Sequence, residues 1–212
     1  MIRAPISRMF RQVDISDVSS SRIYLHSMPG MNEPLETFRE EMWRCGITRI
    51  ICLAPLADVE DYSWSYGQAI KKNADSWTYN LFKIPDFGIP NDRDSYLTFI
   101  TVIAGFILHP SSTKPDGDAA RPWSNAWIIP SIDHPDEIQE HILIHCMAGV
   151  GRSGTFAIIL LLVLGYSREE AERRVKKIGS GPESPKQKHL IDWCESELQR
   201  REKAEVIQYD TV

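Results

Sequence analysis

Short apolar runs alternate with amphipathic stretches along most of the chain. The runs are too short for helices and rich in β-branched residues, so they predict strands. These strands lie at residues 22–28, 49–54, 78–84, 127–129 and 141–145. The stretches between them predict helices, the first from Leu35, Phe38 and Met42, which recur at helical spacing. The predicted helices lie at 35–45, 94–108, 152–164, 168–178 and 184–203.

Residues with special backbone preferences mark the ends of several helices. Gly46 follows the first helix and is a natural stop, because glycine readily takes the left-handed conformation found after helices. Ser167 with Glu170, and Ser184 with Gln187, have the spacing of a capping box, in which side chains satisfy free backbone N–H groups of the first turn. These pairs place the starts of the last two helices.

Three segments lack a regular pattern. Residues 55–76 are acidic and aromatic and predict a loop with a short helix. Residues 109–126 are rich in proline, serine, glycine and aspartate, which predicts a long loop or insertion. Loops of this length in a domain are usually functional or disordered. Residues 135–140 predict a single helical turn.

Strands that alternate with helices are typical of an α/β domain. We therefore expect a mostly parallel central sheet flanked by helices, in a three-layer single domain that spans residues 1–212. In such sheets, ligands bind beyond the carboxyl ends of the strands. The segment 146–151 follows directly on the strand at 141–145, which predicts a ligand site there.

Composition limits the class of protein. The 212 residues are 42% hydrophobic and 9% aromatic, which suffices for a packed core. A single core usually serves up to roughly 250 residues, so one domain is expected. The net charge is −5 and the basic residues are scattered. Binding to nucleic acid or to an anionic membrane needs a concentrated positive patch, so neither partner is expected. The oligomeric state is left open.

Cysteine usage and the lack of long apolar segments predict a cytoplasmic protein. Cys45, Cys52, Cys146 and Cys194 show no C-x-x-C spacing, so free thiols in a reducing compartment are expected. The first residues contain arginines but not the apolar stretch of a secretory signal. The longest apolar run, 156–164, is far shorter than the ~20 residues that span a membrane. It predicts a buried core helix.

The stretch from His145 to Thr155, HCMAGVGRSGT, contains the chemistry of a phosphate-accepting thiol. A cysteine attacks as the thiolate, but a free cysteine is mostly protonated at neutral pH. At a turn from a strand into a helix, successive backbone N–H groups and the helix N-terminus stabilise a thiolate and bind phosphate oxygens. Gly149 and Gly151 allow positive φ angles and close approach to a ligand. Arg152 supplies a planar fork for two phosphate oxygens.

Two more residues fit this chemistry. Ser153 can donate a hydrogen bond to the sulfur of Cys146 and help it to leave from a phosphocysteine, and His145 can hold the loop in shape through a backbone hydrogen bond. The backbone amides of the loop are expected to bind the phosphate. They belong to Met147, Ala148, Gly149, Val150, Gly151 and Arg152.

This combination resembles the signature loop of the protein tyrosine phosphatase superfamily, His-Cys-x5-Arg-Ser/Thr. The resemblance covers residues 22–200 and is greatest to small dual-specificity phosphatases of the cyclin-dependent-kinase-associated type. That likeness rests on RIYLHSMPG at 22–30 and on a helix that ends in Cys-Gly-Ile before a strand. It implies a cysteine-dependent phosphatase that acts on phosphotyrosine-type substrates through a phosphocysteine at Cys146, without a metal or organic cofactor.

A second motif implies an acid. Residues 84–90, IPDFGIP, resemble the family's mobile loop W-P-D-x-G-x-P and are called the acid loop from here on. The resemblance implies that Asp86 protonates the leaving oxygen and then activates water, with Ile84 in the place of the tryptophan. Asp92 is the alternative acid, because some smaller relatives carry the acid elsewhere in this loop. The resemblance also implies that Gln187 takes the place of a glutamine that positions water in related enzymes. The alternative, at least equally favoured, is that Gln187 only caps its helix.

The resemblance leaves the substrate partly open. A K-N-R-Y type segment, which deepens the pocket of large tyrosine-specific enzymes, is absent from the sequence, so a shallower cleft would also admit phosphoserine and phosphothreonine. Met147, Ala148 and Val150 include no lysine, unlike the loops of phosphoinositide phosphatases, which favours phosphorylated proteins or aryl phosphates. The alternatives are a phosphatase for a non-protein phosphomonoester and a catalytically weak phosphotyrosine-binding pseudophosphatase.

Two other kinds of site are disfavoured. A nucleotide-binding loop needs a lysine after its second glycine, but Thr155 follows Gly154 directly. A zinc site could be formed by His141, His145 and Cys146. The spacing of the two histidines would align them on a helix, but this stretch predicts a strand. The other three cysteines are expected to be buried, and one of them could trap an oxidised Cys146 in a disulfide.

Overall fold

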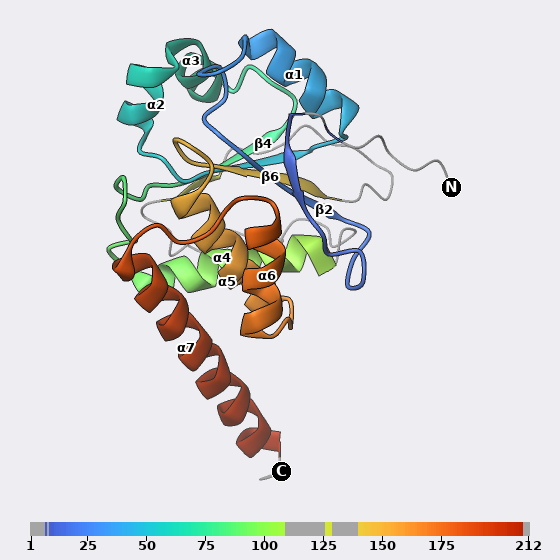
Figure 1. Ribbon diagram of the computed structural model, residues 1–212, viewed down its shortest axis with the longest axis vertical. Coiled ribbons are helices and arrows are strands. Elements are labelled where there is room, and N and C mark those ends of the chain that lie inside the picture. The colour runs from blue at the N-terminus through green and yellow to red at the C-terminus, as the bar shows by residue number, and fades with distance from the viewer. Residues whose placement is uncertain (1–6, 8, 109–125, 129–139, 210–212) are drawn as a thin grey trace.

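The strands form one sheet between two layers of helices (Figure 1). A computed structural model of the chain describes residues 7, 9–108, 126–128 and 140–209. Over these residues the six-stranded sheet has the order β1-β2-β6-β3-β4-β5. Its strands are β1 (Arg11–Val13), β2 (Arg22–His26), β3 (Arg49–Cys52), β4 (Thr78–Phe82), β5 (Ala126–Ile128) and β6 (His141–His145).

The four central strands run parallel, with β6 between β2 and β3, and β4 beside β3. β1 and β5 add antiparallel edges. The mostly parallel α/β sheet expected from the sequence is therefore confirmed. The parallel strands all end at the same edge of the sheet, on the left of Figure 1. The sequence did not predict β1, because three residues carry too little pattern and the strand is defined by its pairing with β2.

The first helical layer covers the upper face of the sheet in Figure 1 and consists of α1 (Leu35–Arg44), α2 (Leu56–Tyr62) and α3 (Trp64–Lys72). The loop with one short helix expected at 55–76 was wrong, since this segment forms two helices. The reason is tertiary packing. Val59 and Tyr66 are fully buried in the core on this face, and that burial stabilises helices in a segment whose acidic composition suggested a loop.

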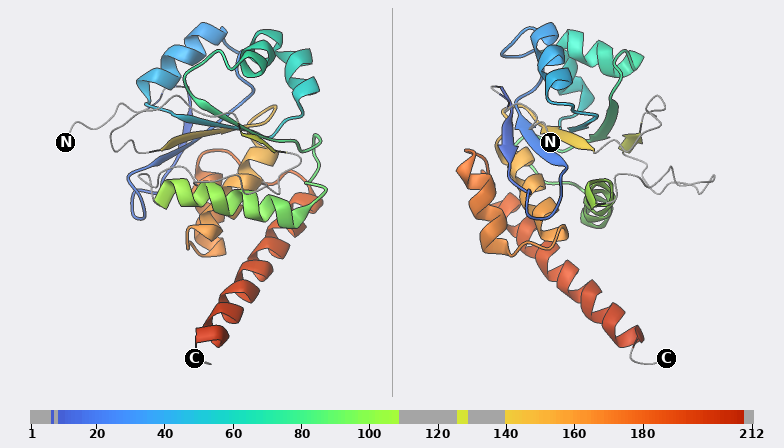
Figure 2. Two further views of the ribbon diagram at one scale, coloured as in Figure 1. Left: turned by 180° about the vertical axis from the view of Figure 1, so that it is seen from behind. Right: turned by 90° about the vertical axis from the view of Figure 1, so that its right-hand side faces the viewer.

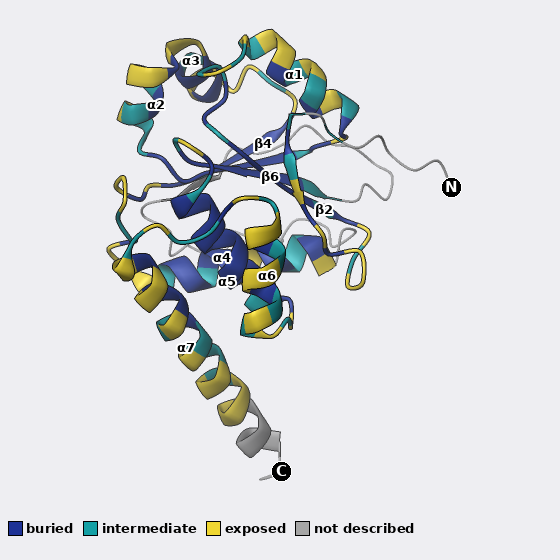
Figure 3. Cartoon of the chain, in the orientation of Figure 1, coloured by how far each residue is buried: buried dark blue, intermediate teal, exposed yellow. Residues whose placement is uncertain are grey.

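The second layer consists of α4 (Arg93–Leu108), α5 (Gly151–Val163), α6 (Arg168–Lys177) and α7 (Pro185–Tyr209). α5 is buried from Gly151 to Leu161, which confirms the core helix (Figure 3). Burial of each large apolar side chain contributes about 1.5–3 kcal/mol, so α5 anchors the loop that precedes it. The later turns of α7 extend away from the sheet (Figure 2).

The helix ends form largely as predicted. Ser167 Oγ accepts a hydrogen bond from the Glu170 N–H at 3.3 Å. Ser184 Oγ accepts one from the Gln187 N–H, and Gln187 Oε1 accepts one from the Ser184 N–H, both at 3.3 Å. Gly46 has a φ of 65° after α1. α7 reaches Tyr209 rather than residue 203.

Two predicted features fall mostly outside the described residues. The insertion at 109–126 is described only at Ala126, which begins β5, and the helical turn at 135–140 only at Glu140. The single-domain organisation over residues 1–212 stays a prediction.

Candidate active site

The loop between β6 and α5 lines a cavity at the carboxyl edge of the sheet. The cavity has a volume of about 190 Å³. Cys146 lies in its wall and is 3% exposed, and Arg152, in the first turn of α5, lines the same cavity. The remaining lining residues are Asp86, Phe87, Met147, Ala148, Glu183 and Gln187. The structure thus brings together the nucleophile, the arginine and the acid that the sequence predicted, although they come from two distant segments.

The carbonyl groups at the start of the loop are held by donors. His145 Nδ1 donates to the carbonyl oxygen of Cys146 at 3.2 Å. The N–H of Met28, in the segment after β2, donates to the carbonyl oxygen of Met147 at 2.8 Å. In a trans peptide the C=O and the following N–H point in opposite directions. A carbonyl held away from the cavity therefore turns the next N–H toward it.

The carbonyls in the middle of the loop are held in the same way. Arg11, from β1, donates through Nη2 to the carbonyl oxygen of Gly149. Ser180 Oγ lies within hydrogen-bond distance of two carbonyl oxygens, that of Gly149 at 3.2 Å and that of Val150 at 2.9 Å, and can donate to either. The N–H of Gly154 also donates to Val150, at 2.7 Å. The loop is therefore fixed by contacts from three separate segments.

The N–H groups of this loop are left without partners. In the part of the chain that the structure describes, the N–H groups from Met147 to Arg152 donate to no acceptor. Buried or partly buried N–H groups are rarely unpaired, and several of them turned to one side form a site for an anion. They lie at the N-terminus of α5, where the helix dipole also favours a negative charge.

The two glycines of the loop have different surroundings. Gly149 has a φ of 72°, and a Cβ atom there would collide with the backbone of His26. The positive φ expected for Gly151 was wrong, because this residue is the first of α5 and takes helical geometry. A Cβ atom on Gly151 would instead meet the carboxylate of Glu183, whose side chain packs against it.

His145 is a neutral, fully buried histidine behind the loop. Burial lowers the pKa of His145 to about 3. Because a carbonyl can only accept, Nδ1 carries the proton that binds Cys146, and Nε2 accepts from the hydroxyl of Tyr66 at 2.8 Å. The loop-holding contact expected for His145 is thus present. Both ring nitrogens of His145 are engaged in these hydrogen bonds, so neither has a lone pair that is available to a zinc ion.

Arg152 ties the acid loop to the cavity. Its Nη1 donates to the carbonyl oxygen of Ile84 at 2.9 Å, and its Nη2 donates to Asp86 Oδ1 at 2.7 Å. Ile84 is buried in the same apolar core as α4 and α5. The isoleucine in place of the tryptophan therefore still anchors this end of the acid loop.

The two candidate acids have different surroundings. Asp86 lines the cavity, and half of its side chain is exposed. Asp92 instead binds the N–H and hydroxyl of Ser95, at 3.0 and 2.6 Å, in front of α4. These bonds hold the pKa of Asp92 below its usual value, which favours the ionised form. Asp92 is thus a helix-capping residue in this structure.

Gln187 lines the cavity, and Ser153 follows Arg152 in the first turn of α5. Ser153 is fully buried, and its Oγ has no hydrogen-bond partner among the described residues. Gln187 is 1% exposed; its Oε1 accepts from the N–H groups of Glu183 and Ser184, and its Nε2 donates to the carbonyl oxygen of Gly88. The capping role of Gln187 is therefore present, and its water-positioning role stays a prediction.

The other cysteines are buried, as expected. Cys52 pairs in register with His145 and so lies on the strand beside the loop, and burial raises its pKa to about 12. Cys194, in α7, also has its pKa raised to about 12 by burial. That one of the three other cysteines forms a disulfide with an oxidised Cys146 stays a prediction.

Two further features concern the described residues alone. They contain no group of three or more His, Cys, Asp or Glu side chains that could hold a metal ion. None of the helices in the same part of the chain has the length and apolarity needed to cross a membrane.

Several residues that shape this site gave no signal in the sequence. Arg11, Met28, Tyr66 and Ser180 hold the loop from segments far away in the chain. Each is a common residue in an ordinary local pattern. Only the fold places them against the loop.

The chain resembles known phosphatases in part of its sequence and in its fold. The family model PTP-SAK, described as the DSP-PTPase phosphatase domain of Swiss Army Knife proteins, matches residues 119–204. No curated protein sequence matches the chain.

Solved structures share its fold at low sequence identity. Kinase associated phosphatase (KAP), with its catalytic cysteine replaced by serine, has a TM-score of 0.61 and 19% identity, over 89% of this chain and 93% of that one. Tk-PTP in the active form has a TM-score of 0.58 and 20% identity, over 90% and 99%. PTPMT1 has a TM-score of 0.53 and 15% identity, over 92% and 99%.

The chain shares the fold of these phosphatases, and its residues 119–204 match the model of a DSP-PTPase phosphatase domain. The resemblance to the protein tyrosine phosphatase superfamily that the sequence suggested is therefore confirmed. The likeness to the kinase-associated type is confirmed at the level of the fold.

Proposed function

We propose that the chain is a cysteine-dependent phosphatase that hydrolyses phosphotyrosine esters in proteins through a phosphocysteine intermediate. One observation carries this proposal. Cys146 and Arg152 line one cavity whose loop presents unpaired N–H groups, a combination suited to holding a phosphate against a thiol. In this proposal the amides from Met147 to Arg152 bind the non-bridging oxygens, and Arg152 binds two of them with the N–H groups not engaged by the acid loop.

In the first step, the thiolate of Cys146 attacks phosphorus, and the bond from phosphorus to the leaving oxygen breaks. Asp86 gives its proton to that oxygen, so that a neutral phenol or alcohol departs. Its position in the cavity wall, on a loop attached to Arg152, supports this role.

In the second step, a water molecule attacks phosphorus in the phosphocysteine. Asp86, now ionised, takes a proton from the water, and the sulfur–phosphorus bond breaks to release inorganic phosphate. Ser153 donates a hydrogen bond to the sulfur as it departs; the buried, unpartnered Oγ supports this assignment.

The cavity rim supports an aryl phosphate in a protein as the substrate. Phe87 lies at the rim and is 63% exposed, so its ring offers an apolar face to a tyrosyl ring. Arg152 is the single cationic residue among the lining residues, and Glu183 adds a carboxylate. Both features disfavour substrates with several phosphate groups. We place the reaction in the cytoplasm, because four free thiols fit a reducing compartment.

A second candidate is hydrolysis of a non-protein phosphomonoester. It is favoured by the fold shared with PTPMT1, which one solved structure shows in complex with PI(5)P. A phosphoinositide carries more negative charge into the cavity rim than a phosphotyrosine side chain does. A direct comparison of the two kinds of substrate therefore separates the candidates.

The test is a panel of substrates at equal concentration: p-nitrophenyl phosphate, peptides with phosphotyrosine or phosphothreonine, and PI(5)P. We expect turnover of p-nitrophenyl phosphate and the highest kcat/KM on the phosphotyrosine peptide. Cys146→Ser should remove turnover and retain binding of the phosphopeptide. Vanadate should inhibit, and a chelator should not. A wild-type protein that binds the peptide without turnover would instead be a pseudophosphatase, and a preference for PI(5)P would select the second candidate.

A further inference from the structure

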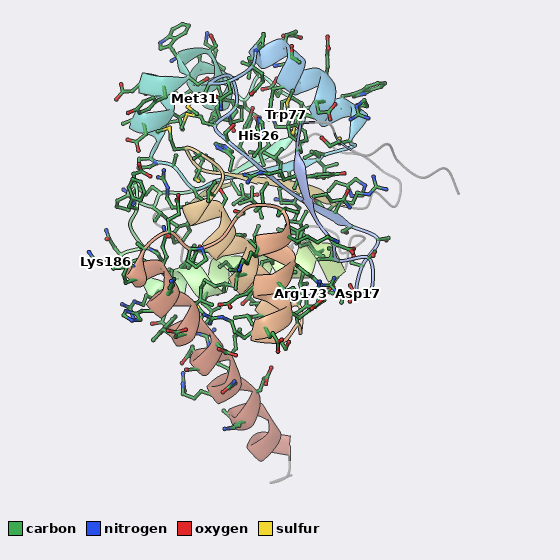
Figure 4. All side chains as sticks on the ribbon, viewed as in Figure 1. Asp17, His26, Met31, Trp77, Arg173 and Lys186 are labelled. Carbon is green, nitrogen blue, oxygen red and sulfur yellow. The ribbon has the colours of Figure 1, made fainter. Side chains whose placement is uncertain are left out.

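Two sets of side-chain contacts hold the acid loop, in addition to the backbone hydrogen bond from the Ile84 N–H to the Leu53 carbonyl oxygen. The first comes from Arg152, which donates to the carbonyl oxygen of Ile84 and to the carboxylate of Asp86. The second comes from the start of α7, whose position beside the loop is marked by Lys186 in Figure 4. Ser184 Oγ donates to the carbonyl oxygen of Phe87 at 3.2 Å, and Gln187 Nε2 lies 3.4 Å from that of Gly88.

In the first set, the contact to Asp86 depends on the charge of its carboxylate, whereas both contacts of the second set are independent of that charge. The ion pair between Asp86 and Arg152 requires an ionised carboxylate, but a general acid carries its proton before the reaction. A bound phosphate also competes with Asp86 for the charge of Arg152. The contacts from Ser184 and Gln187 go to backbone carbonyl oxygens, so neither protonation nor phosphate binding removes them.

The backbone of the loop needs such an anchor at Phe87. This residue has a φ of 52°, in the left-handed region that a bulky side chain rarely adopts. The surrounding structure must therefore maintain the conformation. The N–H of Phe87 is bound by Asp86 Oδ1 at 3.1 Å, and its carbonyl oxygen is bound by Ser184.

The anchor is itself held by hydrogen bonds within the first turn of α7. Ser184 Oγ also accepts from the N–H of Gln187, and Gln187 Oε1 accepts from the N–H groups of Glu183 and Ser184. Gln187 is buried. The first turn of α7 is thus a closed network whose two outward donors both point to the acid loop.

We infer that Ser184, assisted by Gln187, is a positioning residue that keeps the acid loop over the cavity while Asp86 carries its proton. This inference rests on the proposed function, in which Asp86 is the acid. In addition to starting the helix, the first residues of α7 would thus hold Asp86 in position for proton transfer.

Substitutions of Ser184 separate the anchor from the helix cap. Ser184→Asp retains an acceptor for the Gln187 N–H, but an ionised carboxylate cannot donate to Phe87. Ser184→Thr retains both the acceptor and the donor. Ser196→Ala is the matched control, because Ser196 lies on the same helix and donates to the carbonyl oxygen of Asp192 instead.

The first readout is the dependence of the rate on the leaving group. We expect Ser184→Asp to lower kcat on a phosphotyrosine peptide by about tenfold, the effect of one lost hydrogen bond. The loss on p-nitrophenyl phosphate should be clearly smaller, because that leaving group needs little help from an acid. Ser184→Thr and Ser196→Ala should match the wild type. Equal losses on both substrates, or none on either, would overturn the inference.

The second readout does not require activity. Hydrogen exchange of the peptide that contains residues 84–90 should be faster in Ser184→Asp than in the wild type, Ser184→Thr or Ser196→Ala. If the wild type hydrolyses neither substrate, the proposed function fails, and the exchange measurement still decides the anchor. Equal exchange rates in wild type and Ser184→Asp would show that α7 does not hold the loop.

Discussion

Arg11 in β1 donates a hydrogen bond to the carbonyl oxygen of Gly149, across 138 residues of sequence. The same guanidinium also reaches the carbonyl oxygens of Ile178 and Gly179 through Nη1, at 3.4 and 3.1 Å. A single side chain thus joins the edge strand, the loop at 146–151 (called the phosphate loop from here on) and the segment after α6. This contact fixes the orientation of the peptide between Gly149 and Val150.

Removal of this contact should loosen the anion site. Arg11→Ala should weaken the binding of vanadate by about 10- to 100-fold, because hydrogen bonds from a charged donor contribute about 1.5–3 kcal/mol. Arg11→Lys should recover part of this loss, since one ammonium group cannot match the planar fork. Titration with vanadate measures both. Arg173→Ala is the control, because Arg173 is exposed and pairs with Glu170 on its own helix, and an equal loss there would contradict the assignment.

The two candidate acids can be distinguished by their leaving-group dependence. Asp86→Ala should lower kcat on a phosphotyrosine peptide by about 10²–10⁴-fold, the usual contribution of a general acid. The effect on an activated aryl phosphate should be smaller. Asp92→Ala should instead lower the melting temperature through the lost contacts to Ser95. If Asp92→Ala shows the leaving-group pattern and Asp86→Ala does not, the acid is misassigned.

The buried His145 should make the protein sensitive to acid. The pKa of His145 is about 3 in the folded state and 6.5 as the ordinary value. Between these values the unfolded chain binds the extra proton, so the free energy of unfolding falls as the pH falls. From pH 7 to pH 5 the loss should be about 2 kcal/mol.

Urea unfolding of wild type and His145→Asn at both pH values measures this contribution. The variant should lose less stability than the wild type on going to pH 5, by the amount that His145 contributes. His189→Asn, at an exposed position on α7, should keep the wild-type dependence. Identical pH dependence in wild type and His145→Asn would show that the histidine is not buried in the neutral form.

Gly149 should tolerate no side chain. Gly149→Ala combines a positive φ with a collision against the backbone of His26, which cannot move without shifting β2. We expect loss of vanadate binding and of turnover. Gly165→Ala is the matched control, because its φ of 92° imposes the strain but no atom lies within 4 Å of the new Cβ. That variant should lose about 1–2 kcal/mol of stability and remain active. Normal binding by Gly149→Ala would contradict the geometry.

The sequence by itself determined the central strands, most of the helices and the order of candidate residues in the phosphate loop. These features are local. A short apolar run predicts a buried strand, a capping pair such as Ser167 and Glu170 predicts a helix start, and the order of residues around Cys146 is a covalent fact. Asp86 could be paired with Cys146 for the same reason, since both lie in short motifs at the ends of strands.

The tertiary structure decided what holds the loop and the acid in place. α2 and α3 form because Val59 and Tyr66 find a core, which a local pattern cannot report. A Cβ atom at Gly151 would meet the flexible carboxylate of Glu183, a neighbour that only the fold brings there, and the φ of Gly151 is not positive. Arg11 and Ser184 have ordinary local surroundings, and their roles arise because β1 and α7 meet the phosphate loop and the acid loop in space. Hydrogen bonds between distant segments depend on the fold as a whole, so no window of sequence contains them.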